Sequence, residues 1–288
     1  GTQKKNIESA VFVENWGIEG DAHAGNWHRQ ISLLSEETIA AFKARGAEVT
    51  DGAFGENLVV SGYDFTKFPI GTRFTCKDVV LELTQIGKEC HHGCEIFQKM
   101  GECIMPTNGV FAKVLHGGKI SVGDEFHVQY RAAVITLSDT ASKGEREDAS
   151  GAAVEEIVGK EGYEVVLKKI IPDDGDTLTA LLCELSDEDK ADLILTTGGT
   201  GFSKRDNTPE ATMRAVERET PGISEAMRYY SLQITPRAML SRGVSGIRKE
   251  ALIVNLPGSP KAVRECLEYA IGALTHGIDI LKGNPGNC

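Results

Sequence analysis

The chain has 288 residues, of which 41% are hydrophobic and 25% are charged. These ordinary values exclude a disordered chain, and the length predicts two domains at roughly 150 residues per domain. The formal net charge is −11, with acidic residues in both halves, which argues against binding to nucleic-acid phosphates. No stretch approaches the roughly 18 consecutive apolar residues that identify a membrane span.

The cysteines and the first residues indicate the compartment. The seven cysteines are odd in number and follow no secreted disulfide pattern, and the polar start lacks the apolar core of a signal peptide. We therefore expect a cytoplasmic protein with reduced thiols. Because the first residue is not methionine, we also expect that a short native leader is missing or was processed away.

Residues 1–129 predict a compact β-rich domain. One helix is expected over residues 35–45, with Ser35 as its N-cap and Gly46 as its stop signal. Short strands separated by glycine turns are expected at 10–13, 30–34, 57–60, 72–76, 79–86 and 125–128. This pattern is typical of an all-β or α+β barrel-like domain.

Residues 130–288 follow a different pattern, in which strands alternate with helices. Buried strands are expected at 132–137, 163–171, 192–197 and 251–256. Helices are expected at 150–160 and 178–185, after an N-cap at Thr208, and from about 260 to 281. The alternation predicts an α/β three-layer domain with a mostly parallel sheet.

Polar and glycine-rich turns follow three of these predicted strands. They are Ser138-Asp139, the GGTG loop at 198–201 and the PGSP turn at 257–260. Ligands of open parallel sheets bind beyond the carboxyl ends of the strands, and glycines let backbone N–H groups approach an anion. The GGTG loop is therefore a candidate phosphate site, although it matches neither the dinucleotide nor the P-loop pattern. The alternative is an ordinary tight turn.

Two acids near these loops strengthen the phosphate hypothesis. Asp173 follows the strand that is expected to end at residue 171, and Asp206 follows the glycine loop. Carboxylates at strand ends can hold Mg²⁺ beside substrate phosphates, because Mg²⁺ keeps several waters and needs few protein oxygens. The alternative for each residue is a capping or solvated loop acid.

The ordered motifs of this half resemble the MogA/MoaB family, which binds molybdopterin and adenylylates it. They are SDT at 138–140, DASG at 148–151, IPD at 171–173, TTGGTG at 196–201, RDNTPEAT at 205–212, SR at 241–242 and NLPGSP at 255–260. The resemblance implies transfer of AMP from ATP and Mg²⁺ to molybdopterin, with release of pyrophosphate. It also implies a homo-oligomer, a trimer, formed through this domain.

The resemblance assigns site residues in two groups. Asp173 and Asp206 would be catalytic and would support Mg²⁺. The pterin and nucleotide would be bound by Ser138, Asp139, Ser150, Gly151, Gly198, Gly199, Thr200, Gly201, Ser241, Arg242, Pro257, Gly258 and Ser259.

The first half carries its densest chemistry in the segment KECHHGC at 88–94. One interpretation is a tetrahedral Zn²⁺ site formed by Cys90, His91 or His92, Cys94 and Cys103. A second is a reactive thiol at Cys90, with its pKa lowered by Lys88 and the imidazoles. A third is that Cys94 and Cys103 are small buried apolar residues.

Several motifs of this half resemble a MOSC domain, the module named for the C-terminal part of molybdenum cofactor sulfurases. They are GDAHAG at 20–25, RQIS at 29–32, FGENL at 54–58, the Cys90 segment and GGKISVGD at 117–124. The resemblance implies binding of the molybdenum cofactor or its precursor and, in some relatives, sulfur delivery through a cysteine, which aligns with Cys90. Molybdoenzymes are possible acceptors.

Both resemblances point to the same pterin. We therefore expect a bifunctional protein of molybdenum cofactor biosynthesis that binds small molecules rather than nucleic acid or membranes. The competing hypothesis is a noncatalytic carrier or scaffold that holds the cofactor in both domains.

Overall fold

The computed structural model describes residues 4–89 and 95–283 and divides the chain into two compact units. Unit 1 includes residues 4–129, and unit 2 is Tyr130–Lys282. Among the described residues, no helix is long and apolar enough to cross a membrane.

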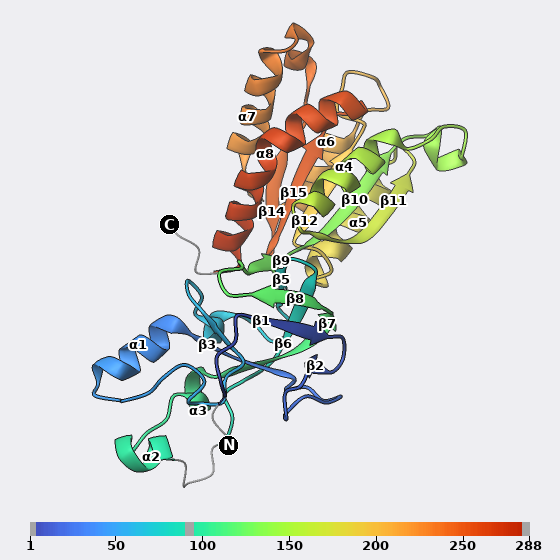
Figure 1. The fold of residues 1–288 in the computed structure, drawn as a ribbon. Coiled ribbons are helices and arrows are strands. Elements are labelled where there is room, and N and C mark those ends of the chain that lie inside the picture. The colour runs from blue at the N-terminus through green and yellow to red at the C-terminus, as the bar shows by residue number, and fades with distance from the viewer. Residues whose placement is uncertain (1–3, 90–94, 284–288) are drawn as a thin grey trace. The chain divides into compact units, whose positions relative to one another are not determined.

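Unit 1 is built on two sheets, drawn in blue to green in Figure 1. The larger sheet has the order β4 (Leu58–Val60), β3 (Ile31–Ser35), β7 (Val110–His116), β6 (Val79–Ile86), β5 (Arg73–Cys76), β9 (His127–Gln129). The smaller sheet has the order β2 (Gly17–Ile18), β1 (Ser9–Val13), β8 (Gly118–Ser121). The predicted β-rich character is therefore present, whereas a closed barrel stays a prediction.

Helical segments complete unit 1, namely α1 (Glu36–Ala44), η1 (Phe65–Lys67), α2 (Glu95–Met100) and α3 (Met105–Asn108). The predicted helix at 35–45 is confirmed by α1, and the Ser35 side chain accepts a hydrogen bond from the Thr38 backbone N–H at 3.2 Å. Apolar side chains of α1 pack with residues of other elements in a second hydrophobic cluster. In this cluster the rings of Phe42 and Phe54 meet edge to face.

Unit 2 is organised around one sheet with the order β11 (Glu164–Ile171), β10 (Arg131–Leu137), β12 (Leu193–Thr197), β15 (Ala251–Leu256), β14 (Ser245–Arg248), β13 (Arg218–Glu219). The first four strands pair in parallel, but β14 pairs antiparallel to both β15 and β13. The predicted mostly parallel sheet is therefore present, and the pairings of β14 make it a mixed sheet. The antiparallel pairing of β14 with β15 arises because β15 returns directly along β14 through a short turn at 249–250, without a crossover helix.

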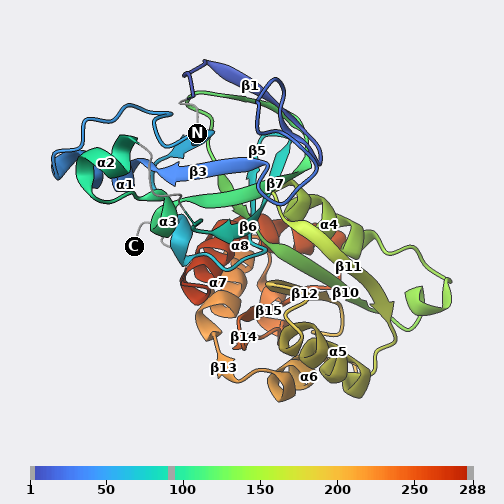
Figure 2. The same ribbon diagram turned by 90° about the horizontal axis from the view of Figure 1, so that it is seen from below.

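Helices cover both faces of this sheet (Figures 1 and 2), which confirms the predicted layered α/β fold. One face is covered by α5 (Gly175–Asp187) and α6 (Thr208–Ala215). The other is covered by α4 (Ala149–Lys160), α7 (Pro221–Leu232) and α8 (Pro260–Leu281). Alternate residues of β10 face opposite layers, so Ala133 and Ile135 join the core beneath α5 and α6.

A buried ion cluster lies at the amino-terminal edge of this sheet. The Asp192 side chain is only 4% exposed and accepts hydrogen bonds from the Arg131 backbone N–H at 2.7 Å and from its guanidinium at 2.8 Å. Lys282 Nζ lies 2.6 Å from Asp192 Oδ1. Burial by itself raises the pKa of Asp192, but the hydrogen bonds from Arg131 and Lys282 outweigh it and hold that pKa below its usual value.

Candidate functional site

Two acids join the ends of neighbouring parallel strands. The Asp173 backbone N–H donates to Asp139 Oδ1 at 3.0 Å, and the Asp139 backbone N–H donates to Asp173 Oδ2 at 3.1 Å. Because Asp139 follows β10 and Asp173 follows β11, these reciprocal bonds fix both loops at the carboxyl edge of the sheet. The structure therefore brings together two residues that the sequence placed at separate strand ends.

The two acids differ in their charge environment. Asp139 accepts hydrogen bonds from the Asp173 backbone N–H and from Arg205, whose Nε and Nη2 lie 3.0 and 2.7 Å from Asp139 Oδ2. These contacts lower the pKa of Asp139. Burial raises the pKa of Asp173, and the negative charges of Asp139 and Asp206 add to this effect. Asp173 is therefore the less compensated of the pair.

Asp206 lies beside the glycine loop. Its Oδ2 accepts a hydrogen bond from the Ser203 backbone N–H at 3.0 Å. A Cβ atom on Gly201 would meet that same oxygen at 2.9 Å, so the loop and the carboxylate are in contact. Burial raises the pKa of Asp173, and the negative charge of Asp206 contributes a smaller part of this effect. The structure thus groups the two predicted metal-binding acids at one end of the sheet.

The glycine loop needs glycine for steric reasons at two positions. Gly198 has a φ of +98°, and a Cβ there would lie 2.3 Å from the Leu137 carbonyl oxygen. Gly199 has a φ of +64°, and a Cβ there would lie 2.3 Å from Thr208 Oγ1 and 3.7 Å from Asp173 Oδ1. Thr208 Oγ1 also donates to the Gly198 carbonyl at 2.9 Å. The loop is therefore packed between the end of β10 and the start of α6, close to the acids.

A cavity of about 170 Å³ opens beside this loop. Its lining includes the predicted residues Ser138, Ser150, Gly198 and Gly258, and also Thr136, Arg146 and Asp148.

Asp148, which is not among the predicted site residues, organises one wall of this cavity. Its Oδ1 accepts from the Gly151 backbone N–H at 2.8 Å, and its Oδ2 accepts from Thr136 Oγ1 at 2.8 Å. A Cβ on Gly151 would meet Asp148 Oδ2 at 2.1 Å, which explains glycine at this position. Gly151 thus shapes the start of α4. The signal was present in the sequence, because Asp directly before a predicted helix is a typical N-cap residue.

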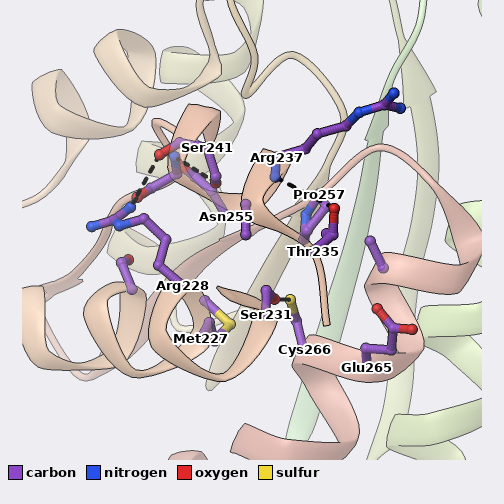
Figure 3. Close-up of a pocket in the computed structure, with 14 residues that line it drawn as sticks. Met227, Arg228, Ser231, Thr235, Arg237, Ser241, Asn255, Pro257, Glu265 and Cys266 are labelled. Carbon is purple, nitrogen blue, oxygen red and sulfur yellow. Dashed lines mark hydrogen bonds between the residues drawn. The ribbon is translucent and has the colours of Figure 1, made fainter. Parts of the chain in front are cut away.

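Other predicted ligands line a second cavity, of about 220 Å³, between α7, α8 and the 3₁₀ helix η3 (Pro236–Leu240) (Figure 3). Ser241 and Pro257 belong to this cavity, together with Arg228 and Asn255, which were not predicted. The Arg228 guanidinium donates to the Gly243 carbonyl at 2.8 Å. The predicted ligands are therefore divided between two cavities.

The turn at 257–260 separates these cavities. Pro257 lines the second cavity, whereas Gly258 and Pro260 line the first. A Cβ on Gly258 would lie 3.3 Å from the Gly198 Cα, so this turn packs directly on the glycine loop. Ser259 caps α8, and its Oγ accepts from the Ala262 backbone N–H at 3.2 Å.

Arg242 contacts the glycine loop rather than either cavity. Its backbone N–H donates to the Thr200 carbonyl at 2.9 Å, and its Nε donates to the Gly201 carbonyl at 2.7 Å. Its Nη2 donates to the Asp206 carbonyl at 2.6 Å. With these donors engaged, Arg242 braces the loop in this structure, and its predicted contact with ligand stays a prediction.

The thiol segment of unit 1 gives less structural information. Cys90, the predicted catalytic thiol, and its neighbours His91, His92 and Cys94 lie outside the described residues. Cys103 lines an open cavity of about 740 Å³. Within residues 4–89 and 95–283, no group of three or more histidine, cysteine or acidic side chains is arranged to hold a metal ion. The zinc and thiolate interpretations therefore both stay predictions.

A layered α/β domain with acids and a glycine loop at the carboxyl edge of its sheet defines a ligand-binding domain. Residues 133–276 match the family described as "Probable molybdopterin binding domain", and residues 20–127 match the MOSC domain. The chain therefore belongs to the molybdopterin-binding family and carries a MOSC domain before it, which confirms the predicted fusion.

Individual relatives support this assignment. The chain is similar to the molybdopterin adenylyltransferase of Helicobacter pylori strain J99, at 43% identity over 157 residues, or 52% of this chain and 87% of the relative. It is also similar to the molybdopterin adenylyltransferase of Escherichia coli K12, at 44% identity over 155 residues, or 51% and 79%. The solved structure of the molybdopterin biosynthesis enzyme MoaB from Thermus thermophilus superposes with a TM-score of 0.52 at 42% identity, covering 55% of this chain and 100% of that structure.

Proposed function

We propose that the protein acts in molybdenum cofactor biosynthesis and that unit 2 is a molybdopterin adenylyltransferase. The observation that carries this proposal is the convergence of Asp173, Asp206 and the glycine loop at one sheet edge, in a domain 43–44% identical to proteins with that name. The substrates would be molybdopterin and ATP, and the products adenylylated molybdopterin and pyrophosphate.

Positioning and charge neutralisation are the main requirements of phosphoryl-type transfer, and no nucleophilic side chain is needed. The Gly198–Gly201 backbone N–H groups would hold phosphate oxygens, since no Cβ at Gly198 or Gly199 blocks their approach. Ser138, Ser150 and Gly258 would contact the ligand in the first cavity, and Ser241 and Pro257 in the second.

The donor set at the acids fits Mg²⁺. Asp173 and Asp206 supply two carboxylates, whereas the third acid of the cluster, Asp139, is bound to Arg205. Two carboxylates with substrate phosphates and waters are a usual Mg²⁺ environment. When bound, the ion would neutralise charge on the transferred phosphate. Asp173 and Asp206 would orient the nucleotide toward the pterin.

For unit 1 we propose binding of the molybdenum cofactor or its precursor, with Cys90 as the residue for sulfur transfer and molybdoenzymes as possible acceptors. For the whole chain we propose a cytoplasmic homo-oligomer, a trimer formed through unit 2. Light scattering would measure the mass, and a strictly monomeric value at all working concentrations would contradict the trimer.

Pyrophosphate release tests the main proposal. The purified chain with molybdopterin, ATP and Mg²⁺ should release pyrophosphate in step with adenylylated pterin, and omission of the pterin should abolish the release. Retention of pterin without any pyrophosphate would instead identify a noncatalytic carrier.

A further inference from the structure

Unit 1 contains a cationic side chain, Arg29, that the proposed chemistry does not yet use. Its guanidinium carbon lies over the Trp27 ring at 4.9 Å from the centroid and over the Phe111 ring at 5.6 Å. Its Nε atom is buried and has no hydrogen-bond partner among the described residues. Because a buried polar group without a partner is costly, this arrangement indicates a missing anionic partner.

A second cation lies on the same aromatic ring. Lys88 Nζ is 5.9 Å from the Phe111 centroid, so Arg29 and Lys88 both contact this ring. The backbone before Lys88 is fixed, because Gly87 has a φ of +71° and a Cβ there would lie 2.2 Å from the Pro106 carbonyl oxygen. Within the described ranges no acid forms an ion pair with Arg29 or Lys88, so both positive charges are available to an anion.

The segment that carries Arg29 is attached firmly to the sheet. Thr84 Oγ1 lies within hydrogen-bond distance of the His28 carbonyl and, at 3.0 Å, of the Phe111 carbonyl, and its single proton is shared between them. The His28 ring Nε2 and Gln85 Oε1 are hydrogen-bonded at 2.9 Å. These contacts attach His28, the residue before Arg29, to β6 and β7 before any ligand arrives.

We propose that Arg29 and Lys88 form a binding site for a phosphate monoester in unit 1. A guanidinium presents a planar fork of N–H donors that matches phosphate oxygens, and the ammonium adds a second positive charge. The inference deepens the proposed cofactor binding by unit 1 and rests on it, because molybdopterin carries a phosphate monoester. It does not depend on the adenylyltransferase activity of unit 2.

The chain supplies its own reporter for this site. It has two tryptophans, Trp16 and Trp27, both in unit 1. In a Trp16→Phe background the tryptophan fluorescence comes from Trp27 alone, which contacts Arg29, so the signal reports on the surroundings of Arg29. Titration with inorganic phosphate, at ionic strength held constant with chloride, should give a saturable change in Trp27 fluorescence.

Variants in this background test the two cations. Arg29→Gln should weaken phosphate binding about tenfold or more, as expected for loss of charge-assisted hydrogen bonds. Lys88→Gln should weaken phosphate binding less. Because Lys88 is partly exposed, this variant should fold normally, so its weaker binding would not be due to misfolding. Lys119→Gln, which removes an exposed lysine of β8, should leave the affinity unchanged. Equal affinity in Arg29→Gln and the parent would overturn the proposal.

A pair of pterins separates this inference from the proposed function of unit 1. A pterin with a phosphate monoester on its side chain should compete with inorganic phosphate and should lose affinity in Arg29→Gln. The same pterin without the phosphate should bind more weakly, and its affinity should be the same in Arg29→Gln and in the parent protein. If both pterins bind equally well, the phosphate site is wrong while pterin binding stands. A fluorescence change that chloride reproduces would likewise reject the site.

Discussion

Asp192 and Asp173 lie at opposite edges of the unit 2 sheet and have pKa values that are shifted in opposite directions. At the amino-terminal edge, Asp192 is buried and is compensated by Arg131 and Lys282, which lower its pKa. At the carboxyl edge, Arg205 is bound to Asp139, and Asp173 has a raised pKa. A fully compensated acid stabilises the fold, whereas an acid without its own cation is available for a ligand cation. The comparison therefore separates a structural edge from the proposed functional edge.

The largest expected effect is on catalysis at the functional edge. Asp206→Asn and Asp173→Asn should fold and still bind pterin, but adenylylation should fall about 100-fold or more, because metal-assisted charge stabilisation is lost. Pyrophosphate release measures this. Asp176→Asn is the matched control, since Asp176 is an exposed acid of α5 that pairs with Arg214. Wild-type turnover in both site variants would remove them from the catalytic role.

The next effect is on stability at the structural edge. Asp192→Asn should lower the free energy of unfolding by about 3–5 kcal/mol, because it leaves Arg131 and Lys282 without their buried partner. Urea unfolding measures the change, and adenylylation per folded molecule should persist. Asp189→Asn removes an acid that is 69% exposed and contacts the same two cations, and it should cost less than about 1 kcal/mol. Equal losses in both variants would contradict this distinction.

The same comparison predicts a pH dependence. The folded-state pKa of Asp192 is lowered, so its stabilisation is present above the unfolded value of about 3.9 and is lost as the pH falls through the folded pKa. Wild-type protein should therefore lose stability below about pH 4. Urea midpoints measured between neutral and acidic pH should fall less steeply with decreasing pH in Asp192→Asn than in the wild type. The same decrease in both proteins would show that Asp192 is not the responsible group.

Thiol reactivity provides a kinetic contrast within the whole chain. Burial raises the pKa of the Cys76 and Cys266 thiols, which makes them poor nucleophiles at neutral pH. We expect iodoacetamide to label Cys90, or its neighbour Cys94, on the order of tenfold faster, because Lys88 and the nearby histidines favour the thiolate. Peptide mass spectrometry over a time course measures the order of labelling.

A Cys90→Ser variant serves as the control for that experiment. It should lose persulfide or cofactor retention in unit 1 while adenylylation by unit 2 continues. Stoichiometric zinc that protects Cys90, Cys94 and Cys103 together would support the structural-metal interpretation instead. Uniformly slow labelling without metal would favour a noncovalent role for unit 1.

The smallest expected effect is a gain in stability at the functional edge. Because burial and neighbouring charges raise the pKa of Asp173, its ionised form opposes folding at neutral pH. Asp173→Asn should therefore leave the melting temperature unchanged or slightly higher, opposite in sign to Asp192→Asn. The difference should shrink as the pH falls, since the wild-type carboxyl then becomes neutral. A clear decrease at neutral pH would reverse our assignment of the two edges.

Local signals in the sequence predicted much of unit 2. Continuous apolar runs predicted β10, β12 and β15, and the Ser35 N-cap located α1 in unit 1. The sequence analysis did not predict β7 or β14, and β14 is a short strand, Ser245–Arg248, that is defined by its pairing with β13 and β15. Segments whose structure depends on pairing rather than on local pattern are hard to predict from one sequence.

The candidate site was predictable in composition but not in arrangement. Glycines and acids after buried strands indicated the loops, and the structure groups Asp139, Asp173 and Asp206 as strand order requires. The division of the other predicted residues between two cavities depends on how the 257–260 turn packs against Gly198. The bracing role of Arg242 likewise depends on three-dimensional contacts with loop carbonyls.

The 257–260 turn has a thermodynamic consequence, because one short segment forms part of the wall of both cavities. If a ligand in one cavity shifts the conformation of this turn, it also changes the affinity of the other cavity for its own ligand. By linkage, the reciprocal effect must have the same magnitude. Two substrates that each move this turn would therefore bind cooperatively or anticooperatively, and a substitution at Gly258 would change that coupling in both directions at once.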